Sequence, residues 1–158
     1  MDSQSVMILT IRTDKPVAEI GLFKDSKKIA YERWRAHRQL TATIHKKLQQ
    51  ILDPSTKISK LHNPLTDYSA RDLVRGKQVL SLDDIEGIVV FKGPGSFTGL
   101  RIGLTVANAM AYSSNVPIVA RSGQKWIQTG IKDLQAGKND KIALPRYGHP
   151  ANISKPKK

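Results

Sequence analysis

Apolar residues in the first third of the chain follow two different periods. Three short runs rich in branched residues, at 6–11, 17–23 and 29–34, are separated by turn-forming residues such as Pro16. They predict three strands joined as a β-meander. A helical period then takes over and predicts an amphipathic helix over 37–52. The apolar positions that define this helix are Leu40, Ile44, Leu48, Ile51 and Leu52.

The second half of the chain alternates between strand and helix patterns. Residues 85–91 form an apolar run without polar alternation, which is typical of a buried strand, and 116–120 form a shorter one. Helical patterns follow each of them, at 98–114 and 122–134. A meander followed by this alternation predicts an α/β fold with parallel later strands, in the order βββαβαβα.

Two stretches lack a sustained period. Residues 54–84 are mostly polar and are interpreted as a long connection inserted within one lobe that spans 1–134. Residues 135–158 carry three prolines and many lysines, and we expect this basic tail to be extended or disordered. No internal repeat is visible.

The charge balance narrows the class of partner. The chain of 158 residues has 26 Lys and Arg against 13 Asp and Glu, a formal net charge of +13. Such an excess favours polyanions, RNA above all, although many basic proteins are merely well solvated. Cysteine is absent, which excludes disulfides and thiolate chemistry. No apolar run is long enough to cross a membrane, so a cytoplasmic location is expected.

A glycine-rich loop joins the buried strand at 85–91 to the next helix. Backbone N–H groups and the helix dipole at such a junction can hold an anion, whereas a turn that only needs glycine is the simpler reading. The spacing is neither that of a dinucleotide-binding fold nor that of a Walker A loop. The histidines lack metal-binding spacing, and no residue is predicted to be catalytic or to bind metal. The candidate anion-loop residues are Gly93, Gly95, Ser96, Thr98 and Arg101.

Small residues recur every four positions in the helix after this loop, so one face is nearly bare of side chains. Close approach of another backbone is therefore predicted, either from the sheet of the same chain or from a partner helix. Both readings stay open at this point. The stripe consists of Gly99, Gly103, Ala107 and Ala111, flanked by Leu100 and Leu104.

The segment GPGSFTGLRIG at 93–103 resembles the signature of the TsaB (YeaZ) family, which takes part in threonylcarbamoyladenosine formation on tRNA. The small-residue helix and proline-containing strand after it are similar too, as are VMILTIRTDKPVAEIGLF at 6–23 and RAHRQLTATIHKKLQQIL at 35–52. The resemblance implies a lobe of the actin-like, ribonuclease H-like ATPase superfamily. It looks like a minimal form that lacks most of the second lobe.

The resemblance also implies partners and a division of labour. In the family, the helices at 37–52 and 98–114 pack against TsaD, which carries the nucleotide, the metal and the transferase activity, and TsaE, an ATPase, joins the assembly. The expected interface residues are therefore His37, Leu40, Ile44, Leu48, Gly99, Leu100, Gly103, Leu104, Ala107 and Ala111. No cofactor of its own is expected, tRNA would bind through the complex, and a homodimer is an option for the isolated chain.

One departure bears on catalysis. The family's first strand usually ends in an Asp, where this chain has Arg12. A cation there cannot hold Mg²⁺, which argues against autonomous ATP chemistry. The leading hypothesis is a non-catalytic scaffold subunit that activates a TsaD-type transferase. The alternatives are a freestanding basic RNA-binding protein and, more remotely, a peptidase or kinase-fold enzyme.

Overall fold

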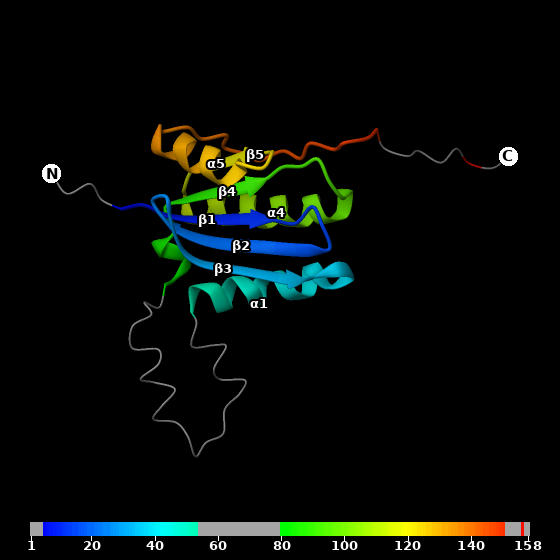
Figure 1. Ribbon diagram of the computed structural model, residues 1–158, viewed down its shortest axis with the longest axis horizontal. Coiled ribbons are helices and arrows are strands. Elements are labelled where there is room, and N and C mark those ends of the chain that lie inside the picture. Colours follow the sequence, from blue (N-terminus) through cyan, green and yellow to red (C-terminus); the bar gives the residue numbers. More distant parts are fainter. Residues whose placement is uncertain (1–4, 54–79, 151–155, 157–158) are drawn as a thin grey trace, which may run out of the picture.

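The computed structural model describes residues 5–53, 80–150 and 156. Within them a five-stranded sheet is flanked by three helices, and the predicted α/β order is confirmed (Figure 1). Short 3₁₀ turns at His37–Gln39 and Leu82–Asp84 precede α1 and β4. The elements are β1 Met7–Arg12, β2 Val17–Lys24, β3 Lys27–Arg35, α1 Leu40–Leu52, β4 Gly87–Phe91, α4 Phe97–Ser114, β5 Ile118–Arg121 and α5 Trp126–Gln135.

The sheet has the strand order β3-β2-β1-β4-β5. The meander supplies the antiparallel pairs β1–β2 and β2–β3, while β1–β4 and β4–β5 are parallel. β1 lies in the centre, with Leu9 paired to Leu22 on one side and to Ile88 on the other. Because β1 and β4 are parallel, their carboxyl ends meet at the same edge, the usual place for a binding site in such folds.

The two sheet faces are covered unequally. α1 packs on β2 and β3 and touches α4, which packs on β4 and β1. On the opposite face α5 packs on β4 and β5, where the Phe91 and Trp126 rings meet edge to face at 5.7 Å. Side chains alternate along a strand, so Ile88 and Val90 of β4 point toward α4 instead. Figure 1 shows β2 and β3 with no described helix in front of them.

Helix and strand limits differ slightly from the predictions. The helix predicted at 37–52 begins with a 3₁₀ turn, because the N–H groups of Ala36 and His37 both donate to the Pro16 carbonyl. α5 begins at Trp126 instead of residue 122, because Gly123 adopts a left-handed conformation with φ of 85°. The Ser122 hydroxyl there donates to the Gly93 carbonyl. The inserted connection predicted at 54–84 lies largely at 54–79, outside the described residues.

The last described residues contain no helix or strand after Gln135, yet they are docked on the lobe. The Asn108 side chain on α4 makes two hydrogen bonds to the Ala143 backbone, 2.9 and 2.8 Å long. The Arg146 N–H donates to the Lys92 carbonyl at 2.6 Å, and the Phe97 and Tyr147 rings stack at 4.1 Å. Residues 139–147, called the C-terminal segment below, thus form no helix or strand and are fixed in place by these contacts.

Candidate partner face and anion pocket

The glycines of the 93–103 segment allow close backbone packing. A Cβ on Gly95 would collide with Asp14, one on Gly99 with the Thr13 carbonyl, and one on Gly103 with the Thr13 hydroxyl. A Cβ on Gly93, which has φ of 112°, would meet the Arg146 carbonyl. Three of these glycines therefore seat the first turns of α4 on the end of β1, and left-handed backbone freedom is needed only at Gly93.

Hydrogen bonds hold this junction together. The buried Thr13 hydroxyl donates to the Gly99 carbonyl at 2.6 Å, and the Ser96 N–H donates to the Asp14 carbonyl at 3.2 Å. The Ser96 hydroxyl is the N-cap of α4 and accepts the Gly99 N–H at 3.4 Å. The loop is thus largely occupied with its own packing, which favours the structural reading of the glycine motif over a phosphate cradle.

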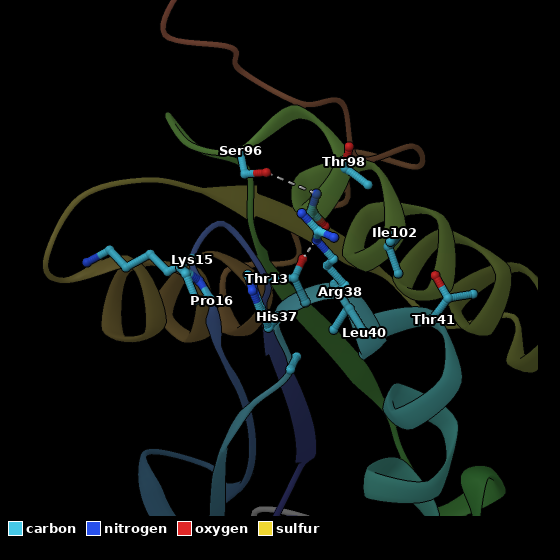
Figure 2. A pocket seen from close by; sticks show the side chains of 12 residues that line it. Thr13, Lys15, Pro16, His37, Arg38, Leu40, Thr41, Ser96, Thr98 and Ile102 are labelled. Atoms are coloured by element: carbon cyan, nitrogen blue, oxygen red, sulfur yellow. Dashed lines mark hydrogen bonds between the residues drawn. The ribbon is translucent and has the colours of Figure 1, made fainter.

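A cavity of about 360 Å³ opens beside this junction, at the carboxyl end of β1. Its walls come from the β1–β2 turn, from the start of α1 and from the first turns of α4. Figure 2 shows Arg38 pointing from the α1 side toward the first turn of α4, whereas Lys15 extends away from it. The lining residues are Thr13, Lys15, Pro16, Ala36, His37, Arg38, Leu40, Thr41, Ser96, Thr98, Gly99 and Ile102.

The pocket is cationic and rich in hydroxyls. Two Lys or Arg side chains, one histidine and four hydroxyl groups line it, and no carboxylate does. A guanidinium such as that of Arg38 can bind a phosphate or carboxylate through two N–H groups. Among the described residues no three His, Cys, Asp or Glu side chains gather into a metal-binding group. The arrangement suits the binding of an anionic group.

The Arg12 guanidinium forms an ion pair with the Asp14 carboxylate. The guanidinium donates to both Asp14 carboxylate oxygens, at 2.7 and 3.1 Å, and its Cζ lies 4.0 Å from the centre of the Phe91 ring. The hydrogen bond to Asp14 raises the pKa of Arg12 despite partial burial. The end of β1, where the sequence resemblance leads one to expect an acid, thus carries this ion pair.

The predicted anion-loop residues fall into two groups. Ser96 and Thr98 line the pocket, together with Gly99 from the small-residue stripe. Gly93 and Gly95 are packing positions, and the exposed Arg101 does not line the cavity. Sequence reasoning missed Lys15, Arg38 and Thr41. A usable signal existed, because Lys15 lies in the turn after the first predicted strand and Arg38 lies in the first turn of the helix predicted at 37–52.

The structure corrects the predicted partner interface. Most of the proposed side chains face the chain's own core, because α1 and α4 lay their apolar stripes on the sheet, and core packing is the reading of the stripe that holds. His37 is exposed and Gly99 is partly exposed. The buried residues are Leu40, Ile44, Leu48, Leu100, Gly103, Leu104, Ala107 and Ala111.

Another ridge on α4 remains accessible. Ile102, Val106 and Met110 are partly buried, pack against the edge of the core and follow one another every four residues. Thr105 and Ala109, on the next stripe, are exposed. Ile102 shares the pocket with Leu40 and Thr41 at the start of α1. The accessible side of the α1–α4 pair therefore combines an apolar ridge with a cationic pocket at one end.

No described helix is both long and apolar enough to span a membrane.

Sequence comparisons connect this lobe to two protein families. The family model of TsaD, tRNA N6-adenosine threonylcarbamoyltransferase, matches residues 59–124. The TsaB protein of Bacillus subtilis is 56% identical over 39 residues, which are 25% of this chain and 17% of that protein. The TsaB of Haemophilus influenzae is 26% identical over 73 residues, which are 46% of this chain and 31% of that protein. The tRNA N6-adenosine threonylcarbamoyltransferase of Syntrophotalea carbinolica is 41% identical over 61 residues, which are 39% of this chain and 18% of that protein.

Solved structures show the same fold. YeaZ from Pseudomonas aeruginosa superposes with a TM-score of 0.55 at 18% identity and covers 74% of this chain and 44% of its own. A second structure, of a protein described as similar to peptidase YeaZ from the same organism, gives a TM-score of 0.53 at 19% identity. The chain spans less than half the length of the relatives it matches. Over part of its relatives' length, the chain is therefore similar to TsaB (YeaZ) proteins in sequence and shares their fold.

Proposed function

We propose that this chain is a non-catalytic subunit of the machinery that makes threonylcarbamoyladenosine on tRNA, and that it binds and activates a TsaD-type transferase. Nucleotide and metal would sit on that partner, and a TsaE-type ATPase and tRNA would join through the complex. The observation that carries the proposal is the conjunction of the family match with the accessible α1–α4 face.

The comparisons themselves support a partner of like architecture. The matches to TsaB proteins and to the TsaD transferases are both partial, and the TsaD family model takes in β4, α4 and β5. Two chains that share a lobe can pair through corresponding surfaces, as homodimers do around a two-fold axis. The α1–α4 face would then meet its counterpart on the partner, and a homodimer would use the same face when the partner is missing.

The chemistry of the face suits such pairing. The Ile102, Val106 and Met110 ridge offers partly exposed apolar area, and the exposed neighbours Thr105 and Ala109 are small. Small exposed residues allow close approach of a partner helix. The cationic pocket at the α4 N-terminus borders this face, and an anionic group at the subunit junction would bind to Arg38 there.

The described residues give little support for independent catalysis. Arg12 pairs with Asp14 at the end of β1, and the pocket lining holds no carboxylate that could act as a base or a metal ligand. A kinase-like or peptidase activity is therefore the weaker alternative, and a freestanding RNA-binding role stays as the second candidate on charge grounds.

The test is co-purification of this chain with the TsaD-type protein of the same cell. Thr105→Arg places a long cation on the exposed surface of α4 and should weaken capture at least tenfold. Thr129→Arg is the matched control, since Thr129 is an exposed threonine on α5 at the opposite sheet face. Equal capture of both variants and the unmodified chain would overturn the α1–α4 assignment. Absence of capture altogether would overturn the proposed function.

A further inference from the structure

One sheet face is only partly covered. α5 packs on β4 and β5, and the same face continues over β2 and β3, where no described helix covers it (Figure 1). Residues that alternate with the core positions Ala18, Ile20 and Leu22 point to this side. They include Gly21 and Phe23, and Tyr31 is the cross-strand neighbour of Gly21 on β3.

An aromatic pair forms the floor of this surface. The Phe23 and Tyr31 rings meet edge to face, with centres 6.5 Å apart. Both rings lie over Gly21, where a Cβ would come within 2.8 Å of each. The Lys28 ammonium lies 5.6 Å from the centre of the Tyr31 ring. Burial, and then the nearby Glu19 carboxylate, raise the pKa of Tyr31 to about 12, so the phenol stays neutral at physiological pH.

A groove of about 340 Å³ runs between this hairpin and α5. Phe23, Ile127 and Ile131 give it an apolar wall, and Lys125 and Lys132 contribute ammonium groups from α5. Ser26 and Gln128 complete the lining. The groove is therefore apolar at its base and cationic at its rim.

The cations of this surface outnumber its acids. The Glu19 carboxylate forms ion pairs with the Nε atoms of Arg33, at 2.9 Å, and of Arg12, at 3.9 Å. Within the part of the chain that the structure describes, Lys125 and Lys132 form no ion pair. Lys24, Lys27, Lys28 and Arg35 are exposed on the same hairpin. The surface thus has an unbalanced positive charge around an aromatic floor.

We infer that this β2–β3 and α5 surface, called the hairpin groove, binds a single-stranded RNA segment. Phosphates would meet the lysines of the rim, while a base stacks on the accessible part of the Tyr31 ring beside Lys28. Stacking on aromatic side chains combined with a positive groove is the general mode of single-strand binding. Charge complementarity alone would also suit an acidic peptide, but Asp and Glu side chains offer no aromatic ring that could stack on Tyr31 as a base does.

The hairpin groove is separate from the proposed partner face, because α5 and the α1–α4 pair lie on opposite faces of the sheet. Binding of RNA here does not depend on capture of a TsaD-type protein. Loss of one function with retention of the other is therefore measurable, and the failure of either proposal can be recognised.

The test is fluorescence anisotropy of the full chain with a labelled oligouridine of about ten nucleotides, over a series of salt concentrations. Lys125→Gln with Lys132→Gln should flatten the slope of log K against log salt by about 1.4, since each phosphate contact with a single strand contributes about 0.7. Tyr31→Leu should weaken binding between roughly fivefold and a hundredfold, whereas Tyr31→Phe should retain it.

The matched control is Lys46→Gln with Lys141→Gln, which removes two exposed lysines outside the groove and leaves the total charge equal to that of the test variant. Wild-type salt dependence in this control supports the groove. An equal loss in both double variants, or unchanged binding by Tyr31→Leu, would overturn the inference. Competition by polyglutamate as effective as by the oligouridine would assign the surface to acidic peptides instead.

Discussion

Two segments, 93–103 and the C-terminal segment, meet at the carboxyl edge of the sheet and are held there by different kinds of contact. The 93–103 segment packs closely because its glycines have no side chains. Thr13, Asp14 and the Arg146 carbonyl occupy the space that a Cβ on these glycines would need. The C-terminal segment instead docks mainly through individual polar bonds, among them those of Asn108 and of Asp140, together with the buried Ala143 and the Tyr147 ring. Close packing tolerates no added atom, whereas a hydrogen-bonded segment can come off one bond at a time.

This difference predicts different responses to substitution. Added volume at the glycines should disturb the whole lobe, because α4 and β1 both belong to the main core. Loss of a polar anchor should release only the C-terminal segment and leave the sheet intact. Global and local unfolding can be separated by comparing denaturant titration with amide hydrogen exchange.

The largest effect is expected from Gly103→Ala. The new Cβ would collide with the Thr13 side chain, and overpacking of this kind costs about 3 kcal/mol in the free energy of unfolding. Thr13→Ala in the same chain removes the colliding hydroxyl, so the double variant should recover part of the loss. Urea unfolding of the four chains of this double-mutant cycle measures the coupling.

Ala109→Leu is the control for helix propensity and added volume, because Ala109 lies on the exposed side of the same helix. It should change the free energy of unfolding by less than about 0.5 kcal/mol. Additive effects of Gly103→Ala and Thr13→Ala would show that the glycine stripe does not rest on Thr13.

Most of the fold could be predicted from the sequence, because strands and helices have simple periods. The runs at 6–11 and 17–23 and the helical spacing from Leu40 onward place most of the elements within a few residues. The docking of the C-terminal segment could not be predicted. It depends on single contacts such as Asn108 with Ala143, 35 residues apart, which no local period encodes.

The site was predicted less well than the fold, for a physical reason. The small-residue stripe is equally suited to a sheet and to a partner helix, so the sequence left both readings open. The structure places Gly103 and Ala107 against the chain's own sheet, with Gly103 against Thr13. The cationic pocket was missed because Arg38 and Thr98 are 60 positions apart in the sequence and meet only through the fold.

A smaller, local effect is expected from Asn108→Ala. The substitution removes both hydrogen bonds to the Ala143 backbone, which are together worth about 1–2 kcal/mol. Exchange of the Ala143 amide hydrogen should accelerate roughly tenfold, while amides of β1 and β4 exchange as before. Asn108→Asp keeps the hydrogen-bond acceptor and loses the donor, so its exchange rate at Ala143 should lie between those of the unmodified chain and Asn108→Ala. Equal acceleration throughout the sheet would mean that the C-terminal segment is part of the global core.

The smallest effect concerns a charged anchor of the same region. The hydrogen bond from Lys138, and then that from Arg121, lower the pKa of Asp133 below its ordinary 3.8. Arg121 also bonds to Asp140 at 2.8 Å, so the cluster joins α5, β5 and the C-terminal segment. A carboxylate with a lowered pKa stabilises the fold above its unfolded pKa, and this contribution disappears as the pH falls through the folded value.

Asp133→Asn should therefore lower the free energy of unfolding at pH 6 by less than about 1 kcal/mol, as expected for a pair near the surface. The difference between the variant and the unmodified chain should shrink as the pH falls from about 4 to 2, because the unmodified carboxyl then becomes neutral as well. Lys138→Gln keeps the Arg121 contact and should show a smaller version of the same dependence. Urea titrations across this pH range measure both effects. If the stability difference between Asp133→Asn and the unmodified chain stays constant down to pH 2, the Asp133 carboxylate does not anchor the C-terminal segment.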